Sequence, residues 1–155
     1  MTWIRYTLPA AAIVSAAAPA YAVQYLSIGE AQKNAFPSAH FTEVQAGRVW
    51  KAEAGGKVEG FFIFDRVIGK HLYIDYAVAL TPGGAVHKVE ILQYRESYGG
   101  EVRSPSWLAQ FVGKTTGSAL KINGDIRNIS GATLSSTHVT EGVKRILAAY
   151  ANRLR

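Results

Sequence analysis

The chain has 155 residues, enough for one domain with a buried core, and it carries a formal net charge of +6 and no cysteine. The lack of cysteine excludes disulfides, thiolate metal sites, iron–sulfur clusters and cysteine-attached haem, so any electron transfer must depend on an organic cofactor. The positive residues are scattered singly, without Lys/Arg blocks, which argues against nucleic acid as a partner.

The first 22 residues have the pattern of a secretory signal peptide. A short basic start ends at Arg5, an uncharged stretch runs from Leu8 to Ala18, and Ala20-Tyr21-Ala22 offers small residues at the positions that determine cleavage. The alternative is an uncleaved membrane anchor, although the uncharged stretch is short for a bilayer-spanning helix. We predict cleavage after Ala22, a periplasmic or otherwise exported protein that is free or membrane-associated, and one domain over residues 23–155.

A short helix and then several strands are predicted up to residue 94. Ser27 and Glu30 form a capping box, and the helix that follows should end before Pro37. Runs rich in β-branched and aromatic residues, separated by glycine-containing turns, predict strands at residues 48–53, 58–67, 72–80 and 86–94. Short connections make these strands an antiparallel meander, so the predicted fold is α+β, a twisted antiparallel sheet with packed helices. Strict alternation in the last strand places on one face Val86, Lys88, Glu90, Leu92 and Tyr94.

A loop and a short helix follow the last strand. Glu96 to Gly100 has the composition of a flexible loop, and Ser104-Pro105 predicts the start of a helix over residues 106–112. Trp107 and Phe111 share one face of that helix, where they either fill the core or form flat walls for a planar cofactor. Residues 120–125 are predicted to form a strand that ends in a turn.

Ser130 to Thr137 is a stretch of small and hydroxyl-bearing residues before the most regular helical pattern of the chain. From Thr137 on, apolar residues recur at steps of three and four as far as Leu154. The first turn of a helix has N–H groups without intrahelical partners and a partial positive charge, so it stabilises an anion such as phosphate. The stretch therefore predicts a phosphate site, the alternative being that Ser135, Ser136 and Thr137 only cap the helix.

The string Ser130-Gly131-Ala132-Thr133-Leu134-Ser135-Ser136 closely resembles the flavinylation motif of the FMN-binding domain family. That family occurs in the flavin-bearing subunits of Rnf complexes and of the sodium-translocating NADH:quinone reductase. Residues 84–92, 94–100 and 107–114 resemble further family segments, in the same order. Three residues before the Ser of the motif the family usually has Asp, where this chain has Arg127.

The resemblance implies that the protein carries FMN through a phosphoester bond to Thr133. It places Ser130, Gly131, Ala132, Leu134, Ser135 and Ser136 around that bond, Glu96, Ser97 and Tyr98 near the flavin, and Trp107 and Phe111 beside its ring. A Thr hydroxyl is a weak nucleophile without a base, and none is evident beside Thr133. His138 is expected to be a surface residue near the start of the helix.

In the family a separate, Mg-dependent flavin transferase makes the bond from FAD. The protein is then an electron carrier and a substrate of that transferase, and not an enzyme with its own small substrate. Its other partner would be a membrane electron-transport protein or another redox protein. No catalytic residue or metal ligand is expected in the chain itself.

The sequence leaves three further functions open. The first is reversible binding of FMN or another phosphate ligand, with Arg127 disfavouring attachment. The second is a flavin-dependent reductase with its own small substrate, and the third is a scaffold without flavin.

We predict that the exported protein begins at Val23. Cleavage after Ala22 removes the basic start and the uncharged stretch together. The intact mass of the exported protein measures this directly, and a species that still begins at Met1 would favour the membrane anchor.

Overall fold

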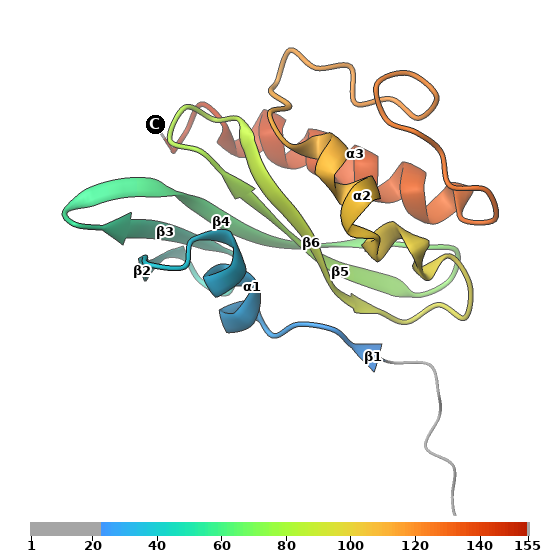
Figure 1. Cartoon of the computed structure of the whole chain (residues 1–155), viewed down its shortest axis with the longest axis horizontal. Coiled ribbons are helices and arrows are strands. Elements are labelled where there is room, and N and C mark those ends of the chain that lie inside the picture. Colours follow the sequence, from blue (N-terminus) through green and yellow to red (C-terminus); the bar gives the residue numbers. More distant parts are fainter. Residues whose placement is uncertain (1–22, 155) are drawn as a thin grey trace, which may run out of the picture.

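The computed structural model describes residues 23–154, so the predicted signal peptide lies outside the described residues. Its centre is a six-stranded antiparallel sheet with the strand order β1-β6-β5-β4-β3-β2 (Figure 1). The strands are β1 (Val23–Gln24), β2 (His40–Gln45), β3 (Val49–Ala54), β4 (Lys57–Ile68), β5 (Tyr73–Leu80) and β6 (Val86–Tyr94). The predicted α+β fold with an antiparallel sheet is confirmed.

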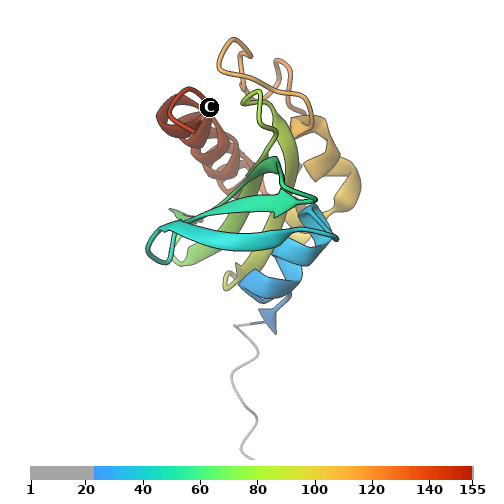
Figure 2. The same ribbon diagram turned by 90° about the vertical axis from the view of Figure 1, so that its left-hand side faces the viewer.

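Helices cover both faces of the sheet. On one face lies α3 (Thr133–Tyr150), together with three short turns of helix: η1 (Gly100–Arg103), α2 (Pro105–Leu108) and η2 (Ala109–Phe111). On the other face lies α1 (Ile28–Ala35), as the two views in Figures 1 and 2 show. Among residues 23–154 no helix is long and apolar enough to cross a membrane.

The two faces bury separate apolar clusters. The larger cluster packs α3 and the segment with α2 against the sheet and includes Ile63, Tyr76, Phe111, Val143 and Ile146. The smaller cluster packs Ala31, Ala35 and Phe36 of α1 and its C-cap against small and aromatic residues of the central strands. Burial of about 25 cal/mol per Å² of apolar surface makes these clusters the main stabilising term of the fold.

Helix α1 forms as its local sequence predicts. Ser27 Oγ accepts a hydrogen bond from the Glu30 amide at 3.2 Å, and the Glu30 carboxylate accepts one from the Ser27 amide at 2.8 Å. This reciprocal pair satisfies two amides at the helix start. The helix ends before Pro37, as expected.

The predicted face assignment of β6 is wrong because the strand contains two irregularities. Val86 pairs with Leu80 whereas Lys88 pairs with Ala79, and a second register shift follows before Tyr94. Each extra residue moves the following side chains to the opposite face. Consequently Val86, Val89, Ile91 and Tyr94 belong to the larger cluster, while Leu92 belongs to the smaller one.

The predicted strand at residues 120–125 is also absent, because Asp125 folds this segment back on itself. Its carboxylate accepts hydrogen bonds from the amides of Leu120 at 3.1 Å and Lys121 at 2.9 Å. The Lys121 amide, together with Lys114 at 3.0 Å, lowers the pKa of Asp125 to about 2. Within this segment an isolated bridge joins Ile122 and Ile126.

Helix α3 approaches the sheet closely at Gly142. A Cβ atom at this position would lie 2.4 Å from the Tyr76 hydroxyl oxygen and 2.9 Å from a methyl carbon of Val67. The Tyr76 hydroxyl donates a hydrogen bond to Asp65 Oδ2 at 3.0 Å, and burial raises the pKa of Tyr76. The absence of a side chain at Gly142 therefore lets the helix rest on a buried, hydrogen-bonded tyrosine.

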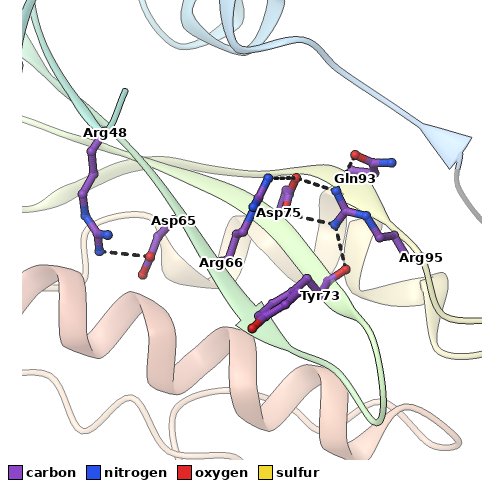
Figure 3. A network of polar contacts seen from close by, with 7 residues as sticks. All are labelled: Arg48, Asp65, Arg66, Tyr73, Asp75, Gln93 and Arg95. Atoms are coloured by element: carbon purple, nitrogen blue, oxygen red, sulfur yellow. Dashed lines mark hydrogen bonds and ion pairs between the residues drawn. The ribbon is translucent and has the colours of Figure 1, made fainter. Parts of the chain in front are cut away.

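The same carboxylate binds two arginines. Arg48 donates to Asp65 Oδ1 at 3.0 Å (Figure 3). Arg145 of α3 donates to Asp65 Oδ2 at 2.7 Å. Burial alone would raise the pKa of Asp65, but the hydrogen bonds from Arg145 and Tyr76 and the charge of Arg48 hold it below its ordinary value. A charged residue inside the structure, Asp65 of β4, thus links α3 to the β2–β3 turn.

We predict that Gly142→Ala lowers the free energy of unfolding by about 1–3 kcal/mol, because the added methyl group forces Tyr76 or α3 to move. Urea unfolding measures the change. Glu141→Ala, on the exposed side of the same turn, is the control and should stay within about 0.5 kcal/mol of the wild type. A Gly142→Ala protein as stable as this control would show that the close approach is unimportant.

Candidate functional site

A cleft of about 550 Å³ lies where three separate segments of the chain meet. Residues 70–71 come from the β4–β5 turn, residues 96–99 from the loop after β6, and residues 131–135 from the start of α3. Pockets that bind small molecules and cofactors have volumes of about 300–1,000 Å³, so the cleft is of a suitable size. Two segments predicted to surround the flavin, 96–98 and 131–135, therefore do lie together.

Thr133 is exposed at the start of α3, four residues before the predicted beginning of the helix. The N-cap is Ala132, and no side chain caps the first turn. Gly131 turns the chain into the helix with a φ of +80°, a conformation that glycine adopts without strain. The first-turn amides, which belong to residues that line the cleft, are thus open to an anion.

Ser135 and Ser136 do not cap the helix, because both are buried inside its first turn. Ser135 Oγ lies 3.0 Å from the Tyr94 hydroxyl oxygen. Ser136 Oγ lies 2.9 Å from the carbonyl oxygen of Ala132, 3.1 Å from that of Thr133 and 3.1 Å from Asn128 Oδ1, and these three acceptors share its one hydroxyl proton. Both serines therefore hold the helix start in place, whereas Thr133 presents its hydroxyl to the outside.

Glu96 lines the cleft, but its carboxylate is used to hold the β4–β5 turn. Oε1 accepts hydrogen bonds from the amides of His71 and Leu72, the latter at 2.8 Å. Burial would raise the pKa of Glu96, but these backbone amides hold it below its ordinary value. Glu96 therefore places Lys70 and His71 at the cleft.

Tyr94 and Gly99 attach the loop after β6 to α3. The Tyr94 hydroxyl donates to the Tyr98 carbonyl and also contacts Ser135. Gly99 has a φ of +88°, and a Cβ atom there would lie 2.5 Å from the Tyr94 hydroxyl oxygen and 3.2 Å from Ala132 Cβ. Only glycine lets the loop approach the helix this closely.

Trp107 and Phe111 lie in the core and not in the cleft. Phe111 is fully buried, Trp107 is 5% exposed, and their rings meet edge to face with 5.1 Å between centroids. Trp107 Nε1 donates to the Arg127 carbonyl at 2.8 Å. The exposed apolar side chains that do line the cleft are Tyr98, which is 86% exposed, and Leu134, which is 48% exposed.

The remaining predicted residues are divided between the cleft and its surroundings. Ser97 lines the cleft, whereas Ser130 is exposed but does not line it. His138 Nδ1 lies 2.6 Å from the Ile68 carbonyl oxygen. Because that partner only accepts, Nδ1 carries a proton, and this nitrogen supports the end of β4 and does not serve as a base.

Four residues at or beside the cleft were not predicted as site residues: Lys70, His71, Gly99 and Asn128. Asn128 Nδ2 donates a hydrogen bond to Thr133 Oγ1 at 3.2 Å. Lys70 and His71 follow Gly69 in a turn with no motif, so only the folded chain brings them to α3. Asn128 carried a weak signal, since it lies two residues before the hydroxyl-rich stretch that begins at Ser130.

The arrangement places a hydroxyl nucleophile beside an open helix N-terminus. An anion bound there is stabilised by about 0.3–2 kcal/mol from the helix dipole. Lys70 adds a positive charge from the β4–β5 turn, which forms another part of the lining. The cleft is therefore suited to a phosphate group held against Thr133, with apolar surface for a larger ligand beside it.

Comparisons with known proteins bear on this site. Residues 69–148 match the family model of the FMN-binding domain, a span that contains every segment of the cleft. Among solved structures, NqrC of Shewanella oneidensis is similar, with a TM-score of 0.56 and 16% sequence identity over 86% of this chain and 82% of that chain. At this identity the likeness shows the fold alone. No curated protein matches the sequence.

We predict that Glu96→Gln, which mimics the protonated side chain, destabilises the protein at neutral pH and much less in acid. A carboxylate whose folded pKa is lowered contributes stability above its unfolded pKa of about 4.3. That contribution is lost as the pH falls through the folded pKa.

Urea unfolding of wild type and variant between about pH 7 and pH 3 measures the difference in this range. Amide exchange at His71 and Leu72 locates it in the turn. Glu59→Gln, at the opposite end of β4, is the control. A difference between Glu96→Gln and wild type that does not depend on pH would contradict the assigned role of the carboxylate.

Proposed function

The chain belongs to the FMN-binding domain family, and on this premise we propose that it is an exported electron carrier with FMN attached through a phosphoester to Thr133. FMN is the cofactor to which the family points. A flavin transferase would make the bond from FAD outside the cytoplasm. A membrane redox complex or another redox protein would exchange electrons with the flavin.

The observation that carries the proposal is the position of Thr133. Its exposed hydroxyl is at the first residue of an 18-residue helix whose first turn has no capping side chain. The product would be a phosphodiester with a single negative charge, which the first-turn amides and the helix dipole stabilise. A reactive hydroxyl and an anion site thus occur within the same turn of helix.

The rest of the cleft supports a bound flavin. Tyr98 and Leu134 offer apolar surface to a planar ring, and Lys70 offers a positive charge to its anionic groups. Glu96 and His138 hold the β4–β5 turn that carries Lys70. Bound FMN would supply transfer of one or two electrons, and the chain has no cysteine and therefore no thiol pair that could perform it.

A tether is physically advantageous in an exported protein. Flavin released outside the cell or into the periplasm is diluted, whereas a covalent bond keeps its local concentration high. The cleft is shallow enough to leave Tyr98 and Leu134 largely exposed, so it would hold a free flavin weakly. Attachment therefore compensates for a site that encloses its cofactor poorly.

Reversible binding of FMN is the second candidate function, and Arg127 favours it. In the family Asp usually stands at this position, and here the Arg127 amide and Nε both donate to Gln110 Oε1, at 2.9 Å and 3.4 Å. If the transferase recognises an acidic side chain at this position, this chain would be modified slowly and would bind flavin without a covalent bond.

We predict that co-expression with a flavin transferase gives a protein whose flavin survives denaturation, and that Thr133→Ala abolishes this signal. Flavin fluorescence in a denaturing gel and the intact mass are the measurements, the mass increasing by FMN less one water. Thr137→Ala, in the same helix, is the control and should remain flavinylated.

Three outcomes are decisive for this experiment. Denaturation-resistant flavin in Thr133→Ala would overturn the attachment site. Flavin that is bound natively but stays in the supernatant after acid precipitation would establish the reversible alternative. A colourless wild-type protein, with the transferase and FAD present, would overturn both.

A further inference from the structure

Asn128 forms two side-chain hydrogen bonds that converge on the start of α3. Its Nδ2 donates to Thr133 Oγ1 at 3.2 Å, and its Oδ1 accepts from Ser136 Oγ at 3.1 Å. Ser136 is fully buried and is fixed further by the carbonyls of Ala132 and Thr133. One end of the Asn128 amide is thus anchored to the helix interior, and the other end holds the exposed hydroxyl.

The backbone around Asn128 is anchored on both sides. On one side, the Arg127 amide donates to Gln110 Oε1 at 2.9 Å, and the Arg127 carbonyl accepts from Trp107 Nε1 at 2.8 Å. On the other side, the Ala132 amide donates to the Ile129 carbonyl at 3.0 Å. These bonds to the α2 segment and within the turn fix Asn128 relative to Thr133.

Asn128 does not act as a helix cap. A capping Asn accepts a hydrogen bond from a first-turn amide, but the amide oxygen of Asn128 is used by the Ser136 hydroxyl. Its nitrogen donates to a side chain and so satisfies no backbone group of α3. The geometry serves the Thr133 hydroxyl and leaves the first-turn amides open.

We propose that Asn128 is a positioning residue for flavin attachment, and that it orients the Thr133 hydroxyl for attack on FAD. The inference rests on the proposed function. The side-chain N–H of Asn128 occupies one lone pair of Thr133 Oγ1, which limits the rotation of the hydroxyl group. The other lone pair and the proton are then directed away from Asn128, toward the incoming phosphate and a base.

The reaction balances without any further reactant. The Oγ1–P bond forms at the phosphorus of the FMN half of FAD, and the P–O bond to the AMP half breaks. AMP leaves with the electron pair of that bond, and the Thr133 proton passes to a base of the transferase. Neither oxidation nor reduction occurs. Asn128 contributes orientation alone, so its removal should slow the reaction and leave the docking of the two proteins unchanged.

The test is the rate at which a flavin transferase attaches flavin to purified Asn128→Ala. FAD and Mg²⁺ are kept in excess, and the concentration of the protein substrate is varied. We expect kcat for attachment to fall about 10- to 100-fold with KM for the protein substrate nearly unchanged. Asn152→Ala, at an exposed position beyond the end of α3, is the matched control and should react like the wild type. The melting temperature of Asn128→Ala should stay within about 5 °C, because Ser136 keeps its two carbonyl partners.

Ser136→Ala provides an independent variant should Asn128→Ala fold poorly. It removes the hydrogen bond that anchors the Asn128 amide, leaves the side chains of Thr133 and Asn128 themselves unchanged, and replaces a buried helical serine with a good helix former. We expect a smaller decrease in kcat, again without a change in KM.

Wild-type rates in both variants would overturn the role of Asn128. A decrease confined to KM would overturn it as well, since it would place Asn128 in the docking surface. Failure of the wild-type protein to accept flavin would instead overturn the proposed function, so the two failures are distinguishable.

Discussion

The close packing of α3 on the sheet is the constraint on which the rest of the structure depends. Gly142 brings the helix against the Tyr76 hydroxyl, and that hydroxyl donates to Asp65, which also binds Arg145 of the helix. A bulkier residue at Gly142 would move the helix away from the sheet, and the hydrogen bonds of Asp65 would lengthen together. Because Thr133 begins the same helix, this packing in the core also determines where the hydroxyl lies.

Buried charge is costly unless it is paired, and the sheet contains two such carboxylates. Asp65 is satisfied by Tyr76 and two arginines, and Asp75 by Arg66 at 2.8 Å and Arg95 at 2.8 Å (Figure 3). Desolvation offsets much of the attraction in such pairs, so they add little net stability. They do fix which partners meet, because a slip in register would leave a charge buried alone. Arg95 also precedes Glu96, so the pairing of Asp75 helps to direct the loop that forms one wall of the cleft.

Local signals predicted those parts of the fold that local interactions determine. The capping box of Ser27 and Glu30 gave the correct helix, and the runs rich in β-branched and aromatic residues between glycine-containing turns gave β3, β4 and β5 correctly. The side-chain faces of β6 were predicted wrongly because its bulges arise from its pairing with β5, which the sequence of β6 alone does not show. The start of α3 was missed because Ala132 is an N-cap without a capping side chain.

Most residues of the cleft were predicted from the family resemblance, but Lys70 and His71 were not. No sequence pattern relates a turn at residue 70 to a helix that begins at residue 133. The resemblance placed Trp107 and Phe111 beside the flavin, but both are buried and pack edge to face in the core, which was the alternative left open.

Each wall of the cleft is held by a side chain that reaches a neighbouring segment. Glu96 binds the β4–β5 turn, His138 binds the end of β4, Tyr94 reaches Ser135, and Asn128 reaches Thr133. These bonds hold in place the backbone of the cleft walls, including the start of α3 where a phosphate would lie, whereas the side chain of Tyr98 is 86% exposed and is not enclosed. On the proposed function this asymmetry has a physical reason. The bond to Thr133 and the helix N-terminus fix the phosphate, while an exposed ring remains within reach of a partner. A carrier must exchange electrons through surface contact, so a deeper pocket would improve retention of the flavin at the expense of its access to that partner.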